Sequence, residues 1–141
     1  MPKSPKVMDH RIRWGRLILA AFLLEVAITA VALPVGMLFS NPLNTAPGAV
    51  VDGTVYFVVV GVACFVLGAV FGNWAAARAT SNFALQGLLV GVIAIAMYLG
   101  LCSLAPGGLA AVIAGYGATM FVIFNVARTL GCVLGAMRRG A

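Results

Sequence analysis

Acidic side chains are nearly absent from this chain, and histidine is scarcer still. The 141 residues include three Asp or Glu and one His, and the three cysteines show no C-x-x-C spacing. A metal centre needs a cluster of such ligands, and acid–base or nucleophilic catalysis needs a set of paired ionisable groups. The sequence therefore predicts no metal, no cofactor and no enzyme activity.

Charged residues of both signs are too few for a soluble domain. They make up 9% of the chain and hydrophobic residues 63%, whereas soluble domains contain about 25% and about 45–50%. Such a chain has too little polar surface to cover a water-soluble globule. We predict an all-α integral membrane protein, with the lipid bilayer as its first partner.

Long apolar runs take the place of charge. Four of them approach the roughly 20 residues that cross a bilayer as a helix. They lie at 17–39, 50–74, 84–104 and 109–127, and the last can extend to 137. The connections are short and contain Pro, Gly or other helix-breaking residues, which predicts an up-down antiparallel four-helix bundle. The single transmembrane domain is thus 17–137, between a basic arm at 1–16 and a basic tail at 138–141.

The basic residues are distributed unevenly among the connections. The 40–48 and 105–108 connections contain no Lys or Arg, and all nine basic residues fall on the other side of the bilayer. The positive-inside rule then predicts a multi-pass cell-membrane protein, most simply of a bacterial inner membrane, with both termini in the cytoplasm. The basic arm is expected to contact anionic lipid, and a nucleic-acid partner is not expected.

The first 33 residues also allow an alternative interpretation as a secretory signal, with A-V-A at 30–32 as the cleavage site. The apolar run continues to Phe39, and Glu25 interrupts the segment. Both features favour the membrane span.

Small residues recur at helical spacing within the spans. Helices associate in lipid where small residues let two backbones approach closely. The glycines expected to provide such contacts are Gly61, Gly68, Gly72, Gly87, Gly91, Gly131 and Gly135. They predict tight packing within the bundle, and they leave open self-association or docking on a larger membrane complex.

Glu25 is the one acidic residue deep in an apolar run. It lies about 12 Å beyond Leu17, near the middle of a ~30 Å hydrocarbon core. An unpaired charge there costs on the order of 2.5–3.5 kcal/mol. Arg128 is the expected partner if the first and fourth helices are neighbours, because their side chains would lean toward each other. Asn125 and Thr29 lie one turn from Arg128 and Glu25 respectively and complete the candidate site.

Three hypotheses fit these residues. They form a satisfied polar clasp that fixes helix pairing, a proton- or ligand-binding site, or a contact with a partner subunit. Asn73 and Gln86 lie toward the cytoplasmic ends of their helices. This concentration of polar groups predicts a pocket open on that side of the membrane.

The stretch AAFLLEVAIT at 20–29 resembles the first helix of the small multidrug resistance family, in which protons and cationic drugs share a Glu. The resemblance covers these ten residues and implies a small proton- or cation-coupled transporter with Glu25 as its binding carboxylate. The strong bias of basic residues departs from the dual topology of that family's antiparallel dimers. We therefore favour a non-enzymatic accessory or assembly protein, with the transporter as the alternative.

Overall fold

Five helices make up the described part of the chain. The computed structural model of the 141-residue chain describes residues 12–39, 53–104, 108–113 and 116–140. Helix α1 spans Trp14–Phe39, α2 Gly53–Ala76, α3 Phe83–Ser103, α4 Gly108–Ile113 and α5 Tyr116–Met137. No strand occurs within these ranges. The prediction of an all-α fold is confirmed.

Four of these helices are long and apolar enough to cross a membrane. The candidate spans are Trp14–Leu38, Val55–Ala76, Phe83–Ser103 and Ala118–Met137. Large apolar side chains such as Phe22, Val66 and Leu134 are exposed on the outside of the bundle. Such a surface suits lipid rather than water. The molecule is therefore a multi-pass membrane protein with four spans.

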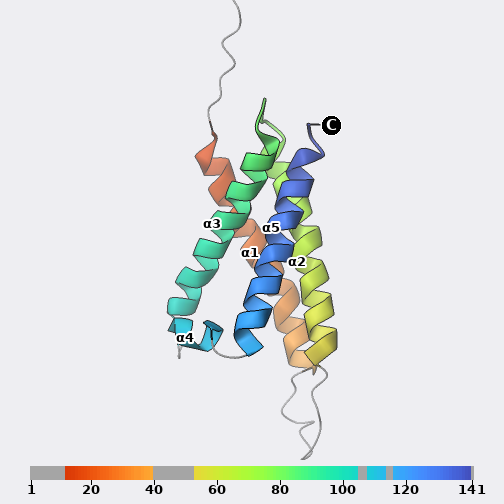
Figure 1. Ribbon diagram of the computed structural model, residues 1–141, viewed down its shortest axis with the longest axis vertical. Helices are drawn as coiled ribbons and strands as arrows, with labels where there is room; N and C mark the ends of the chain where they lie inside the picture. The colour runs from red at the N-terminus through yellow and green to blue at the C-terminus, as the bar shows by residue number, and fades with distance from the viewer. Residues whose placement is uncertain (1–11, 40–52, 105–107, 114–115, 141) are drawn as a thin grey trace, which may run out of the picture.

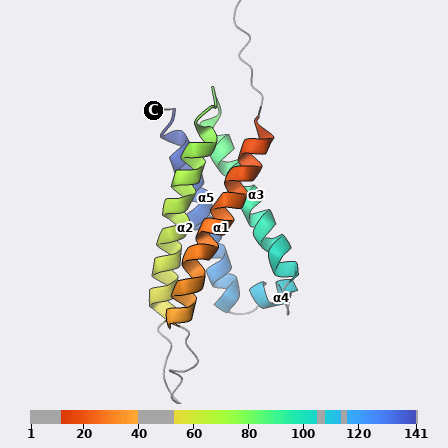
Figure 2. The same cartoon turned by 180° about the vertical axis from the view of Figure 1, so that it is seen from behind.

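The four spans form an up-down antiparallel bundle, as predicted (Figure 1). α1 and α3 run in one direction along the bundle, and α2 and α5 run in the other. The most extensive packing joins α2 to α5, and α3 packs on α5. α1 packs on α2 and α3. α5 lies in front in Figure 1 and α1 lies in front in the reverse view of Figure 2.

The first and last spans are consequently not neighbours along their backbones. No described α-carbon of α1 lies within 8 Å of one in α5. The sequence predicts that these two helices are neighbours if Glu25 and Arg128 pair. That expectation of adjacent helices is wrong. They face each other across the bundle interior, because α2 and α3 occupy the positions on either side.

The fourth span begins later than residue 109, and of the two ends given above, 127 and 137, it has the later one. The short α4 takes up the first part of the apolar run, and the span itself lies within α5 and continues to Met137. The sequence predicts a start near Leu109, which places Arg128 near the inner boundary of the membrane. Arg128 instead lies inside α5, about 13.5 Å before Met137 at 1.5 Å per residue. Helix α1 likewise begins at Trp14 rather than Leu17.

Glycines let the parallel pair α2 and α5 approach closely. A Cβ added at Gly68 or Gly72 would collide with backbone atoms of α5. A Cβ at Gly131 or Gly135 would collide with backbone atoms of α2. The two helices thus present reciprocal G-x-x-x-G faces, which is the arrangement that permits backbone contact between membrane helices.

The glycines of α3 serve the antiparallel contact with α5 in the same way. A Cβ at Gly87 would collide with the α5 backbone, and one at Gly91 would lie 2.9 Å from Thr129 Oγ1. Gly61 on α2 differs, because a Cβ there would lie 3.7 Å from the Phe124 ring, an ordinary contact distance. Each glycine expected to pack therefore faces another helix, but at Gly61 an added Cβ would fit without a collision.

A small-residue core fills one half of the bundle. α1 contributes buried side chains at helical spacing from Leu17 to Leu24, and small residues from α2, α3 and α5 meet them. The cluster consists of Leu17, Ala20, Ala21, Leu24, Ala75, Val90, Ala94 and Cys132.

Candidate functional site

Glu25 continues the buried face of α1. It follows Leu24 and lies one turn beyond Ala21, so the same stripe that packs into the core brings the carboxylate inside the bundle. Only 6% of the residue is exposed. A carboxylate in this position requires an internal partner, because neither water nor lipid reaches it freely.

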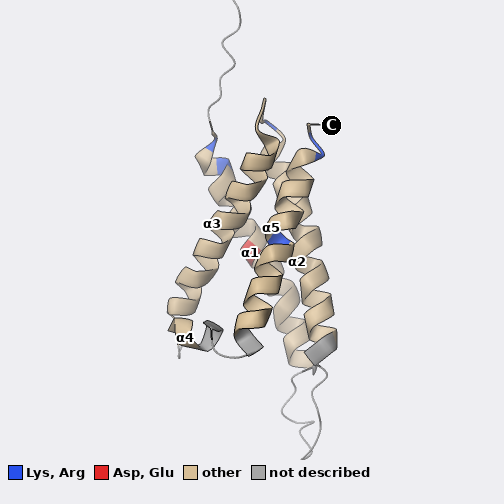
Figure 3. Ribbon diagram, viewed as in Figure 1, with Lys and Arg blue, Asp and Glu red and all other residues tan. Residues whose placement is uncertain are grey.

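Arg128 on α5 is that partner. Its Nη1 donates a hydrogen bond to Glu25 Oε1, and the two groups form a buried ion pair. Figure 3 shows the acidic segment of α1 beside the basic segment of α5 in the middle of the bundle. Because the two backbones are not adjacent, the two long side chains span the interior between α2 and α3. The pair therefore connects the helices that share no backbone contact.

Asn125 holds the guanidinium from its other side. Arg128 Nη2 donates to Asn125 Oδ1, and Asn125 Nδ2 donates to the Phe121 carbonyl at 2.7 Å. The bond to the carbonyl four residues earlier fixes the orientation of the amide. We call Glu25, Asn125 and Arg128 the polar clasp. The structure brings these three predicted site residues together.

Thr29, the fourth predicted site residue, is not part of the clasp. It is exposed, and none of the clasp's hydrogen bonds involves it. The clasp itself is not fully satisfied, since Arg128 Nε is buried and has no hydrogen-bond partner among the described residues. Arginine carries five N–H donors, and an apolar interior rarely supplies partners for all of them.

The chemistry of the clasp is that of a neutral, hydrogen-bonded unit. The single described carboxylate faces a guanidinium, so a cation would have to displace Arg128 to bind there. Within the described ranges no group of three His, Cys, Asp or Glu side chains could hold a metal ion. The arrangement can fix the relative position of α1 and α5, and it offers no nucleophile or general base in contact with solvent.

A second polar region lies at the end of the bundle where α1 begins and α5 ends. We call it the basic end, because Arg13, Arg16, Arg78, Arg138 and Arg139 gather there (Figure 3). Arg16 Nε donates to the Trp74 carbonyl at 3.0 Å, and its guanidinium lies 4.5 Å from the centre of the Trp74 ring.

These contacts at the basic end were not predicted from the sequence. Arg139 Nε also donates to Asn73 Oδ1. The arginines were assigned only to a side of the membrane, and nothing in their spacing identifies their partners. The one available signal was the position of Trp74 and Asn73 at the end of an apolar run, beside basic residues.

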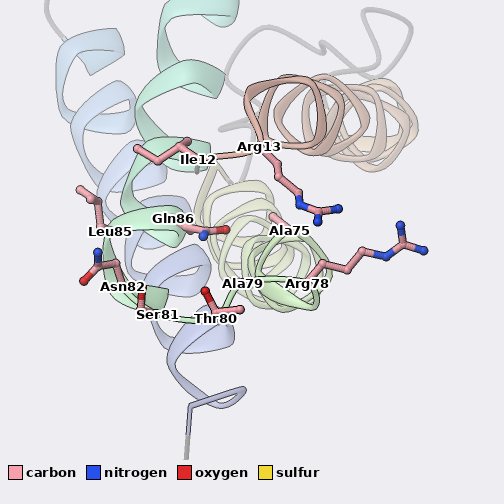
Figure 4. Close-up of a pocket in the computed structure, with 10 residues that line it drawn as sticks. All are labelled: Ile12, Arg13, Ala75, Arg78, Ala79, Thr80, Ser81, Asn82, Leu85 and Gln86. Carbon is pink, nitrogen blue, oxygen red and sulfur yellow. The ribbon is translucent and has the colours of Figure 1, made fainter. Parts of the chain in front are cut away.

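A pocket of about 170 Å³ also opens at the basic end. It lies between the start of α1, the α2–α3 turn and the first turn of α3 (Figure 4). Gln86, which the sequence placed in a polar pocket, lines it, and Asn73 does not. No residue of the polar clasp lines it either. The two polar regions are therefore separate sites.

The chain matches no protein-family model, no curated protein and no solved structure.

Proposed function

We propose that this chain is a small, non-enzymatic integral membrane protein that acts as an accessory or assembly subunit, docking on a larger membrane complex or on itself. The observation that carries this proposal is the internal neutralisation of Glu25 by Arg128 and Asn125. A carboxylate committed to an internal ion pair serves the architecture of the bundle. It leaves the apolar outer surface as the region available to other proteins and to lipid.

The transporter alternative is less well supported. A proton- or cation-coupled carboxylate must exchange its partner during each cycle, and a neighbouring guanidinium opposes the approach of a second cation. Glu25 is nearly inaccessible, and the pocket at the basic end does not include it.

The orientation in the membrane belongs to the same proposal. We place the basic end, and with it both termini, in the cytoplasm, because the described arginines other than Arg128 gather there. Asn44→Cys and Thr80→Cys in a variant whose native cysteines are replaced by alanine can test this placement. An impermeant maleimide should label position 44 in intact cells and position 80 only after lysis. The reverse pattern would require the opposite orientation.

The functional test compares wild type with Glu25→Gln after extraction from native membranes in mild detergent. We expect the wild type to elute in a defined complex larger than the monomer, with one reproducible partner or a second copy, and Glu25→Gln to give less of the same complex because Arg128 loses its charged partner. We expect neither to bind the lipophilic cation tetraphenylphosphonium saturably. Elution as a monomer, together with saturable cation binding that Glu25→Gln abolishes, would replace the accessory role with the transporter.

A further inference from the structure

The pocket at the basic end lies at the level where four spans end. α1 begins at Trp14, α2 ends at Ala76, α3 begins at Phe83 and α5 ends at Met137. Trp14 and Trp74 are both partly exposed at this level, and indole rings prefer the boundary between lipid headgroups and hydrocarbon. The pocket is therefore placed among headgroups, whichever side of the membrane this end faces.

Positive charge at this level is not balanced by any carboxylate in the described part of the chain. Arg13, Arg78 and Arg139 all lie close enough to Arg16 to act on its charge. Glu25 is the only acidic residue within the described ranges, and it is paired with Arg128. A group of like charges near a low-dielectric region favours the binding of an anion.

The pocket supplies directed polar groups in addition to charge. Figure 4 shows the Gln86 amide pointing into the pocket from α3, while the Arg13 and Arg78 side chains extend away from it on the opposite side of the pocket. Thr80 contributes a hydroxyl from the α2–α3 turn. The Asn82 side chain does not cap α3, so the first N–H groups of this long helix add to the positive potential. Guanidinium and hydroxyl donors are the groups that bind phosphate oxygens.

An apolar track continues from the pocket along α3. Leu85 lines the pocket, and Leu88 and Val92 follow it at spacings of three and four residues, on the same face of the helix. All three are exposed. A phosphate that is attached to acyl chains can use this track, whereas a free phosphate cannot.

We propose that the pocket binds the phosphate of an anionic phospholipid between Gln86 and Thr80, with an acyl chain along Leu85, Leu88 and Val92, and that the exposed Arg13 and Arg78 side chains turn toward the phosphate when it binds. This site is independent of the accessory role proposed above, because it rests on the ends of the spans and on the pocket residues alone.

The test uses the full chain in phosphatidylcholine nanodiscs that contain phosphatidylglycerol, followed by native mass spectrometry of the lipid that stays bound after extraction. Arg78→Gln should lower the retained phosphatidylglycerol about tenfold, because it removes charge-assisted hydrogen bonds. Arg138→Gln is the matched control: it removes one charge from the same end, but Arg138 does not line the pocket. It should change retention less than about twofold, since exposed charges are screened.

Three outcomes would overturn the proposal. Equal losses in Arg78→Gln and Arg138→Gln would indicate a diffuse surface charge instead of a site. Equal retention of phosphatidylcholine by wild type would remove the preference for an anionic lipid. Displacement of the lipid by an excess of inorganic phosphate would assign the pocket to free phosphate. Arg13→Gln serves as the second variant if Arg78→Gln fails to fold, and the same tenfold loss is expected of it.

Discussion

The two halves of the bundle are packed in different ways. Between the basic end and the polar clasp, glycines bring backbones into contact and small side chains are completely buried. Beyond the clasp, no described side chain of α1 after Glu25, of α3 after Ala94 or of α5 before Asn125 is fully buried, although Val60 of α2 is. We call these the tight half and the loose half. The clasp lies at the boundary between them.

Three aromatic ring pairs contribute interhelical contacts in the loose half. Phe124 on α5 lies against Tyr56 and Phe57 on α2, with ring centres 6.5 and 5.5 Å apart. Tyr98 on α3 stacks on Phe121 of α5 at 5.9 Å. Rings can shift or rotate at modest cost, whereas two backbones in contact cannot give way locally. The difference indicates a fixed, small-residue core at one end and adaptable contacts at the other.

The largest effect is expected where the halves meet. Glu25→Leu leaves the Arg128 charge buried without its partner. Arg128→Met leaves the Glu25 carboxylate buried without its partner. Each should lower the free energy of unfolding by about 3–5 kcal/mol. The double variant should recover most of that loss, because it removes both charges and keeps the volume apolar. Reversible unfolding in mixed micelles measures all four proteins of the cycle.

One outcome of that mutant cycle would contradict a structural role for the clasp. If the two single losses simply add in the double variant, Glu25 and Arg128 do not stabilise the bundle through each other. The boundary between the halves would then depend on packing alone.

Two glycines on α3, one in each half, allow the packing of the two halves to be compared directly. Gly87 in the tight half leaves no room for a Cβ against α5, while Gly100 near the far end of α3 has nothing within 4 Å of an added Cβ. Gly87→Ala should lower the free energy of unfolding by about 1–3 kcal/mol, the usual cost of overpacking. Gly100→Ala should be neutral or raise it by up to about 1 kcal/mol through helix propensity. Losses of equal size would show that packing is uniform along α3.

Much of this architecture was predictable from the sequence. A membrane-spanning helix is recognised by the hydropathy of about 20 consecutive residues, which depends only on the composition of that stretch. The four spans, their antiparallel order and the all-α fold were predicted in that way. The order of helices around the bundle was not, because every span carries a small-residue face and nothing in the sequence pairs one face with another. The G-x-x-x-G spacings at Gly68 and Gly131 were visible, but their mutual contact depends on packing in three dimensions.

The site was predictable to the extent that burial demands a partner. Glu25 had to be neutralised, and Arg128 was the nearest candidate by depth. The start of α5 was misplaced because the apolar run passes through α4 without interruption, although the A-G-Y-G stretch at 114–117 was a breaker signal. The pocket at the basic end combines residues from α1, the α2–α3 turn and α3. These residues are far apart in the sequence, so the sequence alone does not show that they line one pocket.

A smaller effect is expected at the outer edge of the tight half. Arg16 joins α1 to the last turn of α2 through the Trp74 carbonyl and ring. Arg16→Gln should cost about 1 kcal/mol, from the lost cation–π contact and the lost positive charge at a helix C-terminus. Arg138→Gln, which removes an exposed charge at the same end, should be neutral. Trp74 fluorescence in a Trp14→Phe background should report the change, and an unshifted spectrum would contradict the contact.

The smallest effect tests whether the loose half has unused space. Gly61 on α2 faces the Phe124 ring, and an added Cβ would lie 3.7 Å from it, at an ordinary contact distance. Gly61→Ala should therefore leave the free energy of unfolding unchanged or raise it by up to about 1 kcal/mol, whereas Gly68→Ala two turns along the same helix should lower it. Repeating Gly61→Ala in a Phe124→Leu background separates the two sources of a gain. If the gain persists there, it comes from helix propensity; if it disappears, the new methyl group was packing on the ring. A loss at Gly61 as large as the one at Gly68 would show that the two halves are equally tight and that the aromatic contacts are as rigid as the glycine contacts.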